Sequence, residues 1–326
     1  MMMKISFIVV AYNAAGSLGA LLEDLLAQTI PHEQIEALLV DSASTDATRA
    51  IMLDFAKATP FEVKVLDNPK RWLASGINVA LAAATGDAII RLDAHARIPK
   101  DFLENNLRAL ARGEDIVGGC VLGGAPSGAW ESVLRTVDTS RFCGGAAPFR
   151  NGGEARYVDT LAYALYRREV YDRVGLYDER LRRTEDNDLH YRMRKAGSRF
   201  YFSPDIVSYH AARATMRGQL RQKWGNGYWI GRTMRIQPRC FAPRHLIPAL
   251  FVLALLFGLL LLPFSVWPLL LLLSAYLACD LVFAVRGALS QESGRLLALL
   301  TLPFLFPVVH VVYGVGTLAG LLSGKE

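Results

Sequence analysis

The feature that most restricts the fold is a stretch without any charged residue, which runs from Leu246 to Cys279. A helix needs about 20 apolar residues to cross a bilayer. These 34 residues are too many for one spanning helix and fit two short ones, with a break at "PFSVWP", residues 263–268, which has a proline at each end. A third apolar stretch, interrupted by two prolines and a histidine, follows near the C-terminus. The pattern predicts three membrane spans, at about 246–262, 266–285 and 296–322.

Basic residues indicate the orientation of these spans. The segment 206–245 contains eight Lys or Arg and no Asp or Glu, and it lies directly before the first span. Positively charged flanks stay on the cytoplasmic side of a membrane, and the loop 286–295 adds Arg286 and Arg295. We therefore expect the residues before 246 and this loop to face the cytoplasm, and the short C-terminal tail to face outward. His310, inside the third span, is either a packed polar residue or a functional group.

Charge and cysteine usage exclude several classes of protein. The formal net charge of +6 arises in the basic segment, and residues 1–205 carry a charge near −2. A nucleic-acid-binding protein would spread basic charge over its globular part, so no nucleic acid is expected as a partner. The four cysteines are scattered without a C-x-x-C pair, which is typical of a reducing cytoplasm. The apolar N-terminus is soon followed by Tyr12 and Asn13, and it predicts a buried strand rather than a cleaved signal peptide.

Residues 1–205 alternate between strand and helix patterns. Apolar runs such as "KISFIVVA" predict buried strands, and segments such as "SLGALLEDLLAQT" have leucines at helical spacing. The alternation predicts an α/β fold with a mostly parallel central sheet that is covered on both faces. Ligands of such sheets bind at the carboxyl ends of the strands. Four polar groups follow those ends here: Tyr12 with Asn13, Asp41, Asp67 with Asn68, and Asp93 with His95.

Asp93 and His95 belong to the stretch "IIRLDAHARIP", in which an apolar strand runs into a polar end. Polar residues are common where strands stop, but Asp and His are also metal ligands, and residues two apart point to the same side of an extended chain. The chain has neither a G-x-G-x-x-G motif after its first strand nor a phosphate-binding P-loop. Phosphate groups would then be held through a metal ion on Asp93 and His95. Oxygen and nitrogen ligands suit Mn²⁺ or Mg²⁺, and the imidazole favours Mn²⁺.

Four segments together resemble a known family: "SFIVVAYN", "LLVDSASTDAT", "GINVALAAATGDAIIRLDAHA" and "RRTEDNDLHYRMRKAG". In order and spacing they are similar to the inverting family 2 glycosyltransferases, which have the GT-A fold, and the similarity covers roughly residues 4–235. The basic segment and the apolar C-terminal segments are most similar to membrane-attached enzymes of bacterial exopolysaccharide, or succinoglycan, biosynthesis. The resemblance implies a multi-pass protein of the bacterial inner membrane with its catalytic domain in the cytoplasm.

The resemblance also implies a nucleotide-sugar site at the carboxyl edge of the sheet. Ala11, Tyr12 and Asn13 would line the base and ribose. Asp41 would hydrogen-bond the base, for which uracil is favoured. Arg71 would approach the diphosphate of the donor.

Asp93 and His95 occupy the position of the family's D-x-D motif, which implies that Asp93 contacts both the metal and the nucleotide sugar. His95 departs from the more frequent aspartate. This difference affects the choice of metal more than metal binding itself, because imidazole is a competent ligand. His210, after the strand-like "DIVSY", is a weaker candidate for a third ligand.

Glu185 and Asp186 match an E-D pair of the family, which implies a catalytic role. Displacing a nucleoside diphosphate from an anomeric carbon with inversion requires one carboxylate that takes the proton of the acceptor hydroxyl. A glycosidase, in contrast, places two carboxylates around the bond. We assign Asp186 as the base and Glu185 as a supporting or acceptor-contacting neighbour. The segment "TEDNDL" also has the features of a helix N-terminus, with Thr184 as the cap, and the two roles are compatible.

The basic segment contains "RGQLRQKWGNG", which is similar to a Q-x-x-R-W motif of the family but lacks its spacing. The difference argues against a processive polymerase. Arg221, Lys223 and Trp224 are candidates for contact with the donor diphosphate or with a lipid-linked pyrophosphate. Alternatively, they belong to an amphipathic helix at the membrane interface, whose cations reach to the headgroups.

The chain is thus predicted to have three regions: a GT-A domain at 1–215, a basic amphipathic segment at 216–245 and a membrane domain at 246–326. Within the first region, the Gly-rich segments "IVGGCVLGG" and "RFCGGAAPFRNGG" predict acceptor-side strands and a loop.

The expected activity is the transfer of one sugar from a UDP-sugar to a polyprenyl-diphosphate-linked saccharide. Membrane lipids are expected partners, and other exopolysaccharide-assembly proteins are further candidates. Two alternatives remain: a non-catalytic scaffold that binds nucleotide sugars, and a glycosyltransferase that acts on a simple lipid or a polyprenyl phosphate. A transporter would leave the large soluble domain without a role, and three short spans with one ionisable histidine make a poor pathway.

Overall fold

The computed structural model describes residues 3–124, 126–143, 147–210, 215–291 and 293–324. The chain divides into two compact units, and each is described by itself. Unit 1 comprises Met1–Gly124 and Pro148–Ala211, and unit 2 comprises Ala125–Ala147 and Ala212–Glu326. The segment Ala125–Ala147, which the sequence analysis left with the soluble domain, therefore groups with the C-terminal helices. Residues 144–146 of the predicted Gly-rich loop and residues 325–326 of the predicted C-terminal tail lie outside the described residues.

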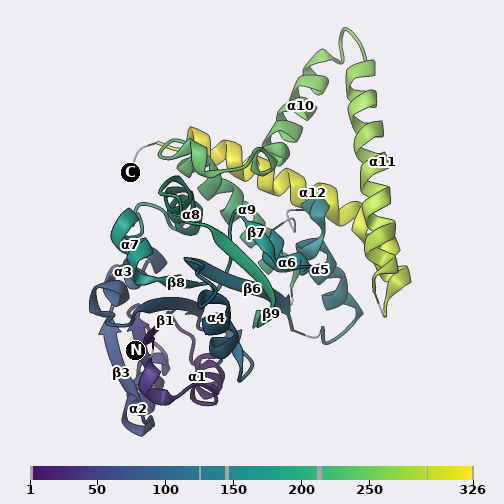
Figure 1. The fold of residues 1–326 in the computed structure, drawn as a ribbon. Coiled ribbons are helices and arrows are strands. Elements are labelled where there is room, and N and C mark those ends of the chain that lie inside the picture. Colours follow the sequence, from purple (N-terminus) through teal and green to yellow (C-terminus); the bar gives the residue numbers. More distant parts are fainter. Residues whose placement is uncertain (1–2, 125, 144–146, 211–214, 292, 325–326) are drawn as a thin grey trace. The chain divides into compact units, whose positions relative to one another are not determined.

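Unit 1 is built on one sheet (Figure 1). Its strands are β1 (Ile5–Ala11), β2 (Ile35–Asp41), β3 (Glu62–Asp67), β4 (Ala88–Asp93), β5 (Ala96–Arg97), β6 (Ile116–Gly123), β7 (Arg156–Val158), β8 (Leu165–Arg167) and β9 (Phe200–His210). The order across the sheet is β3-β2-β1-β4-β8-β6-β9-β5, and β7 also pairs with β9. The strands from β3 to β4 are parallel, whereas β8 is antiparallel to β4 and to β6. The predicted α/β fold is confirmed, with a second half of the sheet that is mixed rather than parallel.

Helices of unit 1 cover both faces of this sheet. They are α1 (Leu18–Leu26), α2 (Thr48–Ala58), α3 (Leu73–Ala83), α4 (Phe102–Leu110), α6 (Pro148–Asn151), α7 (Arg168–Val174) and α8 (Glu185–Lys195), with a 3-10 turn η1 (His32–Gln34). Side chains alternate across a strand, so Phe7 and Val9 pack in one core with α1, α2 and α4, while Ile8 packs in a second core with α3, α7 and α8. Burial on both faces explains why the parallel strands are continuous apolar runs.

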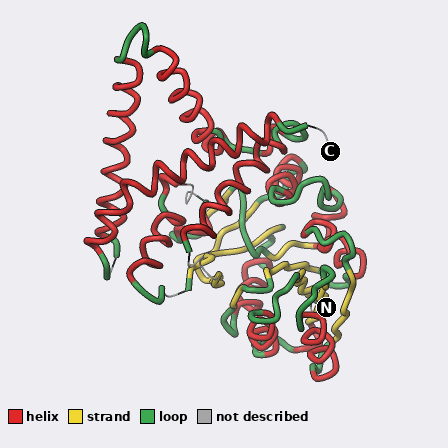
Figure 2. The backbone as a smooth tube through the Cα atoms, turned by 180° about the vertical axis from the view of Figure 1, so that it is seen from behind, coloured by secondary structure: helices red, strands yellow, loops and turns green. Residues whose placement is uncertain are grey.

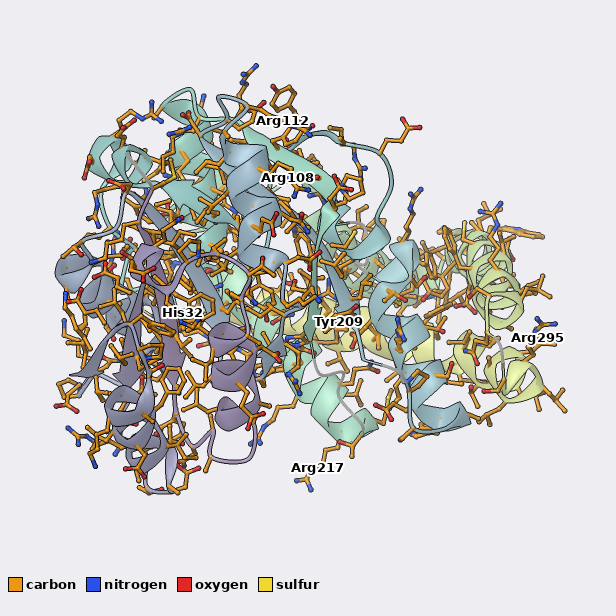
Figure 3. All side chains as sticks on the ribbon, turned by 60° about the horizontal axis from the view of Figure 1, so that its bottom comes forward. His32, Arg108, Arg112, Tyr209, Arg217 and Arg295 are labelled. Atoms are coloured by element: carbon orange, nitrogen blue, oxygen red, sulfur yellow. The ribbon has the colours of Figure 1, made fainter. Side chains whose placement is uncertain are left out.

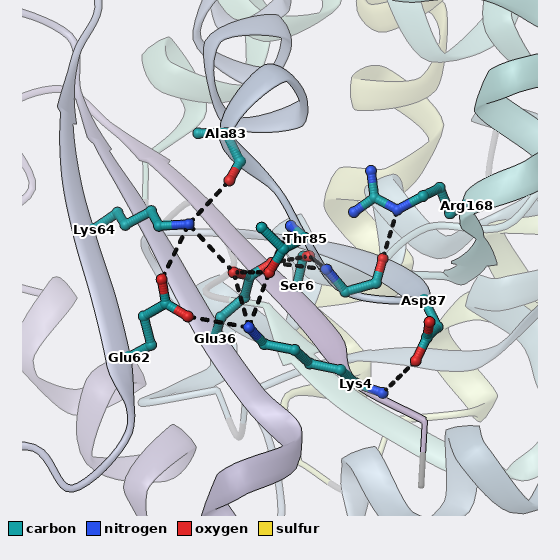
Figure 4. A network of polar contacts seen from close by, with 10 residues as sticks. Lys4, Ser6, Glu36, Glu62, Lys64, Ala83, Thr85, Asp87 and Arg168 are labelled. Carbon is teal, nitrogen blue, oxygen red and sulfur yellow. Dashed lines mark hydrogen bonds and ion pairs between the residues drawn. The ribbon is translucent and has the colours of Figure 1, made fainter. Parts of the chain in front are cut away.

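A buried carboxylate interrupts the apolar run of β2 near its amino end. The side chain of Glu36 is fully buried and accepts hydrogen bonds from the hydroxyl of Ser6, from the hydroxyl and backbone N–H of Thr85, and from the backbone N–H of Gly86 (Figure 4). The ammonium group of Lys4 lies 3.5 Å from the same carboxylate. Burial alone would raise the pKa of Glu36, but the hydrogen bonds from Ser6, Thr85 and Gly86 lower it to about 2. The network therefore ties β1, β2 and the turn before β4 together at the amino end of the sheet.

Unit 2 is helical over its described residues. Its elements are α5 (Ala129–Thr139), the 3-10 turn η2 (Arg141–Cys143), α9 (Met216–Thr233), the 3-10 turns η3 (Pro238–Cys240) and η4 (Pro243–His245), α10 (Ile247–Leu261), α11 (Trp267–Leu289) and α12 (Arg295–Leu322). The sequence analysis missed α5, because the glycines on both sides of it suggested loops and strands. Its apolar residues Val133 and Val137 are one helical turn apart and pack against residues of α11 and α12.

Two of the three predicted spans are long enough to cross a membrane. By length and composition, α11 and α12 qualify, whereas α10 has only 15 residues. Only 11% of the most apolar window of α11 and 28% of that of α12 is buried in the structure, which is unlike the mostly buried core helix of a soluble protein. Figures 1 and 2, which view the chain from opposite sides, both show α10 and α11 as a hairpin whose turn points away from α12.

Candidate active site

Three potential metal ligands meet where β4, β5 and β9 approach one another. A tight turn at Ala94 and His95 separates β4 from β5, and β5 pairs antiparallel with the end of β9, so that Ala96 lies opposite His210. This pairing brings the imidazole rings of His95 and His210 to a centroid distance of 4.6 Å. Asp93, His95 and His210 offer one carboxylate oxygen and two imidazole nitrogens within 4.8 Å of one another. Within the described ranges, no other group of three His, Cys, Asp or Glu side chains has this arrangement.

This donor set fits a divalent ion. One oxygen and two nitrogen donors suit Mn²⁺ better than Mg²⁺, which prefers oxygen ligands. His95 is exposed, while Asp93 and His210 are partly buried, so the group is open to a ligand from one side. Burial alone would raise the pKa of Asp93, but the nearby guanidinium of Arg91 and the other neighbouring polar groups hold it below its ordinary value. Asp93 is therefore ionised, as a metal ligand must be.

Tyr163 links two of the three candidate ligands. Its hydroxyl donates a hydrogen bond of 2.9 Å to Oδ2 of Asp93 and lies 3.1 Å from Nδ1 of His210. A hydroxyl that donates to Asp93 can accept from His210 only if Nδ1 carries the proton, which leaves the lone pair on Nε2 for a metal. The backbone of Tyr163 has a φ of 52°, an unusual left-handed conformation for a bulky residue, and such conformations gather at functional sites.

Arg91 connects the metal-ligand group to the E-D pair. It precedes Asp93 by two residues on β4 and therefore points to the same side of the strand. Its Nη1 lies 3.7 Å from Oδ1 of Asp93, and its Nη2 donates a hydrogen bond of 3.0 Å to Oδ2 of Asp186. Asp186 stands in the first turn of α8, whose N-cap residue is Thr184. Strand β4 and the start of α8 thus meet through a guanidinium that lies between two carboxylates.

The two acids of the E-D pair have different surroundings. The side chain of Asp186 is 39% exposed, whereas Glu185 is almost fully buried. Oε2 of Glu185 has no hydrogen-bond partner among the described residues. Burial, followed by the negative charge of Asp186, raises the pKa of Glu185 to about 7. Only Asp186 is open enough for an acceptor hydroxyl to reach, while Glu185 lies behind it.

Polar residues predicted to bind the nucleotide lie at the carboxyl ends of β1 and β2. Ala11, the last residue of β1, lies beside Asp41, the last residue of β2. Asp41 is buried, and its Oδ1 accepts a hydrogen bond of 3.2 Å from the backbone N–H of Ser44. Asn13 has a φ of 48°, and its side-chain oxygen accepts a hydrogen bond of 2.8 Å from the N–H of Thr45. The loops after β1 and β2 are therefore fastened to each other.

Tyr12 and Arg71 form an exposed pair at the same edge. Tyr12 is 52% exposed, and the guanidinium carbon of Arg71, in the loop after β3, lies 5.9 Å from the centre of its ring. Arg71 also has a left-handed backbone, with a φ of 65°. An aromatic face and a guanidinium held in this way are suited to a base and a phosphate, respectively.

The three candidates on α9 belong to unit 2. Arg221 and Trp224 are exposed, whereas Lys223 is buried and pairs with Asp138 of α5 at 2.9 Å. The charge of Lys223 is thus already compensated within unit 2, and a contact of these residues with donor or acceptor remains a prediction. His310, the other open question, bonds Tyr276 of α11 through Nδ1 and the carbonyl of Phe142 in η2 through Nε2. Both ring nitrogens are used in joining helices, which favours a structural role.

Sequence reasoning missed Arg91 and Tyr163 and gave little weight to His210. Arg91 carried a usable signal, because a residue two positions before Asp93 on a strand must share its side. Tyr163 carried none, because its position depends on a left-handed turn before β8. The signal for His210 was weak, because its place beside His95 depends on β5, a strand of only two residues.

Comparison with known proteins identifies the family. Residues 6–175, more than half of the chain, match the family model for glycosyl transferase family 2. The chain belongs to this family. The resemblance seen in the sequence motifs is thereby confirmed.

Similar proteins match almost the whole chain. The succinoglycan biosynthesis protein ExoA of Rhizobium meliloti is 30% identical over 96% of this chain and 94% of its own length. A dolichyl N-acetyl-α-D-glucosaminyl phosphate 3-β-D-2,3-diacetamido-2,3-dideoxy-β-D-glucuronosyltransferase of Methanococcus voltae is 26% identical over 99% of this chain and 98% of its own. The names of these relatives place them in exopolysaccharide synthesis and in lipid-linked glycan synthesis.

Solved structures share the fold. The mannosyltransferase PcManGT from Pyrobaculum calidifontis, in complex with GDP-Man and Mn²⁺, superposes with a TM-score of 0.63 at 22% identity, covering 99% of this chain and 88% of that one. Residues 1–349 of TarS from S. aureus, in complex with UDP-GlcNAc, give a TM-score of 0.53 at 18% identity, covering 95% and 90%. The GT-A fold expected from the motifs is confirmed.

Proposed function

We propose that this glycosyltransferase transfers one sugar, with inversion, from a UDP-sugar to a lipid-linked saccharide, and that it needs a divalent metal ion, preferably Mn²⁺. The observation that supports the proposal most directly is the chain of contacts from His210 and His95 through Asp93 and Arg91 to Asp186. It joins a set of metal ligands to Asp186, the accessible carboxylate of the E-D pair. The metal complex of one structural neighbour agrees with it.

The donor would lie along the carboxyl edge of the sheet. The base and ribose would contact Tyr12, Asn13 and Asp41. The diphosphate of the donor would contact Arg71. Asp93, His95 and His210 would hold the metal ion. When bound, the ion would act as a Lewis acid that stabilises the negative charge of the departing diphosphate.

The acceptor would approach from the side of α8. Asp186 takes the proton of the acceptor hydroxyl as its oxygen forms a bond to the anomeric carbon, and the bond from that carbon to the UDP oxygen breaks on the opposite face. Arg91 holds the Asp186 carboxylate at 3.0 Å and so fixes its direction before the acceptor arrives. Glu185, buried behind it, sets the local electrostatic potential rather than touching the acceptor.

A polyprenyl-diphosphate-linked acceptor fits a protein that is attached to a membrane. The exposed apolar helices of unit 2 would hold the enzyme at the cytoplasmic face of the bacterial inner membrane, so that enzyme and acceptor diffuse in one plane. Arg221 and Trp224 would lie at the headgroup level. The ExoA-like relative supports an acceptor of exopolysaccharide synthesis, and the Methanococcus relative supports a polyprenyl-phosphate-linked sugar as the second candidate acceptor.

The first experiment is a calorimetric titration of the detergent-purified protein with UDP, with and without Mn²⁺. Asp93→Ala, His95→Ala and His210→Ala should each lose the metal-dependent part of UDP binding. His32→Ala is the matched control, because this histidine of η1 lies outside the site and bonds the carbonyl of Leu26. A UDP affinity that Mn²⁺ does not change in the wild type would contradict the proposed metal site.

Turnover separates an enzyme from a scaffold. UDP release from UDP-glucose, measured with a lipid-linked acceptor, should depend on both the acceptor and Mn²⁺. Metal-dependent UDP binding without turnover on any lipid-linked or polyprenyl phosphate acceptor would instead favour the non-catalytic scaffold.

A further inference from the structure

Helix α12 packs on helices that carry charge both in its first turns and in its second half. Its first turns contact α5: a Cβ on Gly294 would lie 2.7 Å from the Cβ of Ala129, and Ala298 and Leu302 pack with Val133 and Val137. The structure of unit 2 therefore gives α12 a protein-covered side that begins at its N-terminus.

The second half of α12 lies against α9 with the two backbones in contact. A Cβ on Gly316 would lie 2.7 Å from the carbonyl oxygen of Trp224, and a Cβ on Gly320 would lie 2.0 Å from that of Tyr228. A step of four residues on α12 thus matches a step of four residues on α9, so the two helices run parallel. Only glycine allows so close an approach. Beyond the helices, Arg235 donates a hydrogen bond to the carbonyl of Ser323.

The helices that contact α12 carry charge. α9 contains Arg217, Arg221 and Arg232, and Lys223 pairs with Asp138 of α5. α12 is 28 residues long, or about 42 Å at 1.5 Å per residue, and the hydrocarbon core of a bilayer is about 30 Å thick. Because α5 packs on the first turns of α12 and α9 on its second half, α12 could cross the core only by drawing these charged residues into it, which is costly.

The opposite side of α12 has a continuous apolar stripe. Its exposed side chains repeat at intervals of three, four or seven residues: Leu296, Leu300, Phe304, Val308, Val311, Val315 and Leu322. The protein-facing side comprises Ala298, Leu302, Phe306, Val309, His310, Gly314, Gly316, Thr317 and Gly320. A helix with one side on protein and an apolar stripe on the other can lie along a membrane surface with the stripe in lipid.

Positive charges stand at both ends of α12. Arg295, at its start, is exposed and extends away from the ribbon, as does Arg217 at the start of α9 (Figure 3). Arg232 and Arg235 stand beside its C-terminal end. A crossing helix would carry one of these basic ends to the outer side, against the preference of Lys and Arg for the cytoplasmic side.

We propose that α12 does not cross the membrane but lies in the plane of its cytoplasmic surface, with the stripe from Leu296 to Leu322 in the lipid. Only the α10–α11 hairpin, which has no charged residue from Ile247 to Cys279, enters the bilayer deeply. The C-terminal end of α12 then stays on the same side as α9, which differs from the outward-facing tail that hydropathy predicts. This inference rests on the membrane attachment in the proposed function, but not on catalysis.

Cysteine labelling in membrane vesicles tests the side on which α12 ends. In a chain whose four cysteines are replaced by alanine, Gly324→Cys adds a thiol at a position where a side chain meets open space. Lys57→Cys, on exposed α2, marks the cytoplasmic side, and Ser265→Cys marks the turn of the hairpin. A membrane-impermeant maleimide should label Gly324→Cys and Lys57→Cys in inside-out vesicles only. Labelling of Gly324→Cys in right-side-out vesicles would overturn the proposal.

Depth measurements test the direction of the helix independently. Spin labels on Leu300→Cys and Val315→Cys, both in the exposed stripe, should lie at a similar depth of about 5–10 Å below the headgroups. A crossing helix would separate the two labels by about 22 Å along the membrane normal, and that result would refute an in-plane helix. Release of the wild type from vesicles by alkaline carbonate would show that membrane attachment itself fails, and the proposal with it, whereas loss of UDP binding alone would affect only the proposed activity.

Discussion

The replacement Tyr163→Phe removes one oxygen atom from the proposed metal site and tests how that site is organised. The Tyr163 hydroxyl donates to Asp93 at 2.9 Å and lies 3.1 Å from Nδ1 of His210. The phenylalanine ring fills the same space, so the left-handed backbone and the packing of the aromatic ring are kept. What is lost is the group that holds a carboxylate and an imidazole in one orientation.

The size of the effect follows from these contacts. A hydrogen bond to a charged group contributes about 1.5–3 kcal/mol, and loss of a partner that orients a metal ligand weakens metal binding roughly 10- to 100-fold. We expect the Kd for Mn²⁺, measured by electron paramagnetic resonance of the free ion in the presence of UDP, to rise by about this factor. The Kd for UDP without metal should be unchanged, because the hydrogen bonds of the Tyr163 hydroxyl go to Asp93 and His210.

A matched control separates this effect from a general loss of a tyrosine hydroxyl. Tyr157 on β7 also donates to a carboxylate, that of Glu114, at 2.7 Å, but it lies outside the ligand group. Tyr157→Phe should leave the Kd for Mn²⁺ as in the wild type. If Tyr163→Phe binds Mn²⁺ as tightly as Tyr157→Phe does, Asp93 and His210 are not held as metal ligands by Tyr163, and the reasoning fails.

Three further predictions concern carboxylates of unit 1. Asp186→Asn should lower the rate of UDP release by about 10²–10⁴-fold, the usual contribution of a general base, with UDP and Mn²⁺ binding retained in calorimetry. Glu185→Gln should raise the free energy of unfolding at pH 8 by up to roughly 3 kcal/mol and leave it unchanged at pH 4, as measured by urea unfolding. Glu36→Gln should lower the free energy of unfolding at pH 7 by up to roughly 3 kcal/mol. The difference from the wild type should shrink as the pH falls below about 4.5.

The opposite signs of the last two predictions follow from the opposite pKa shifts. The folded-state pKa of Glu185 is raised to about 7, so its ionisation costs stability progressively as the pH rises from about 4.5 to 7. The folded-state pKa of Glu36 is lowered to about 2, so its contribution is present above about 4.5 and is lost as the pH falls toward 2. If the free energy of unfolding depends on pH in the same way in Glu185→Gln and in the wild type, the pKa of Glu185 is not raised in the folded protein. Full turnover by Asp186→Asn would show that Asp186 is not the base.

The parallel half of the fold was predictable because its rules are local. Each apolar run of four to eight residues had to be buried on both sides, and the carboxyl ends of parallel strands always meet at one edge. Asp41 and Asp93 could therefore be placed together without knowledge of the loops. The E-D pair was found from its motif, while its contact with Arg91 came only from the structure.

The antiparallel half was not predictable in the same way. Its strands are short, and their register depends on pairings between distant segments, such as Ala96 opposite His210. A two-residue strand gives no periodicity to detect. The positions of His210 and Tyr163 both depend on this half. For this reason, sequence reasoning gave His210 little weight and missed Tyr163.

Hydropathy also has a physical limit in unit 2. α11 and α12 have the same mean hydropathy of 2.1 in their most apolar windows, because hydropathy measures the composition of a helix and not what lies beside it. The pattern of small residues holds the missing information: α9 contains glycines at 227 and 231, and α12 contains glycines at 316 and 320. Two such G-x-x-x-G rows predict helices with backbones in contact. α9 carries the exposed Arg217 and Arg221. A helix that packs along α9 therefore has to stay where these charges are hydrated, even if its own residues are apolar.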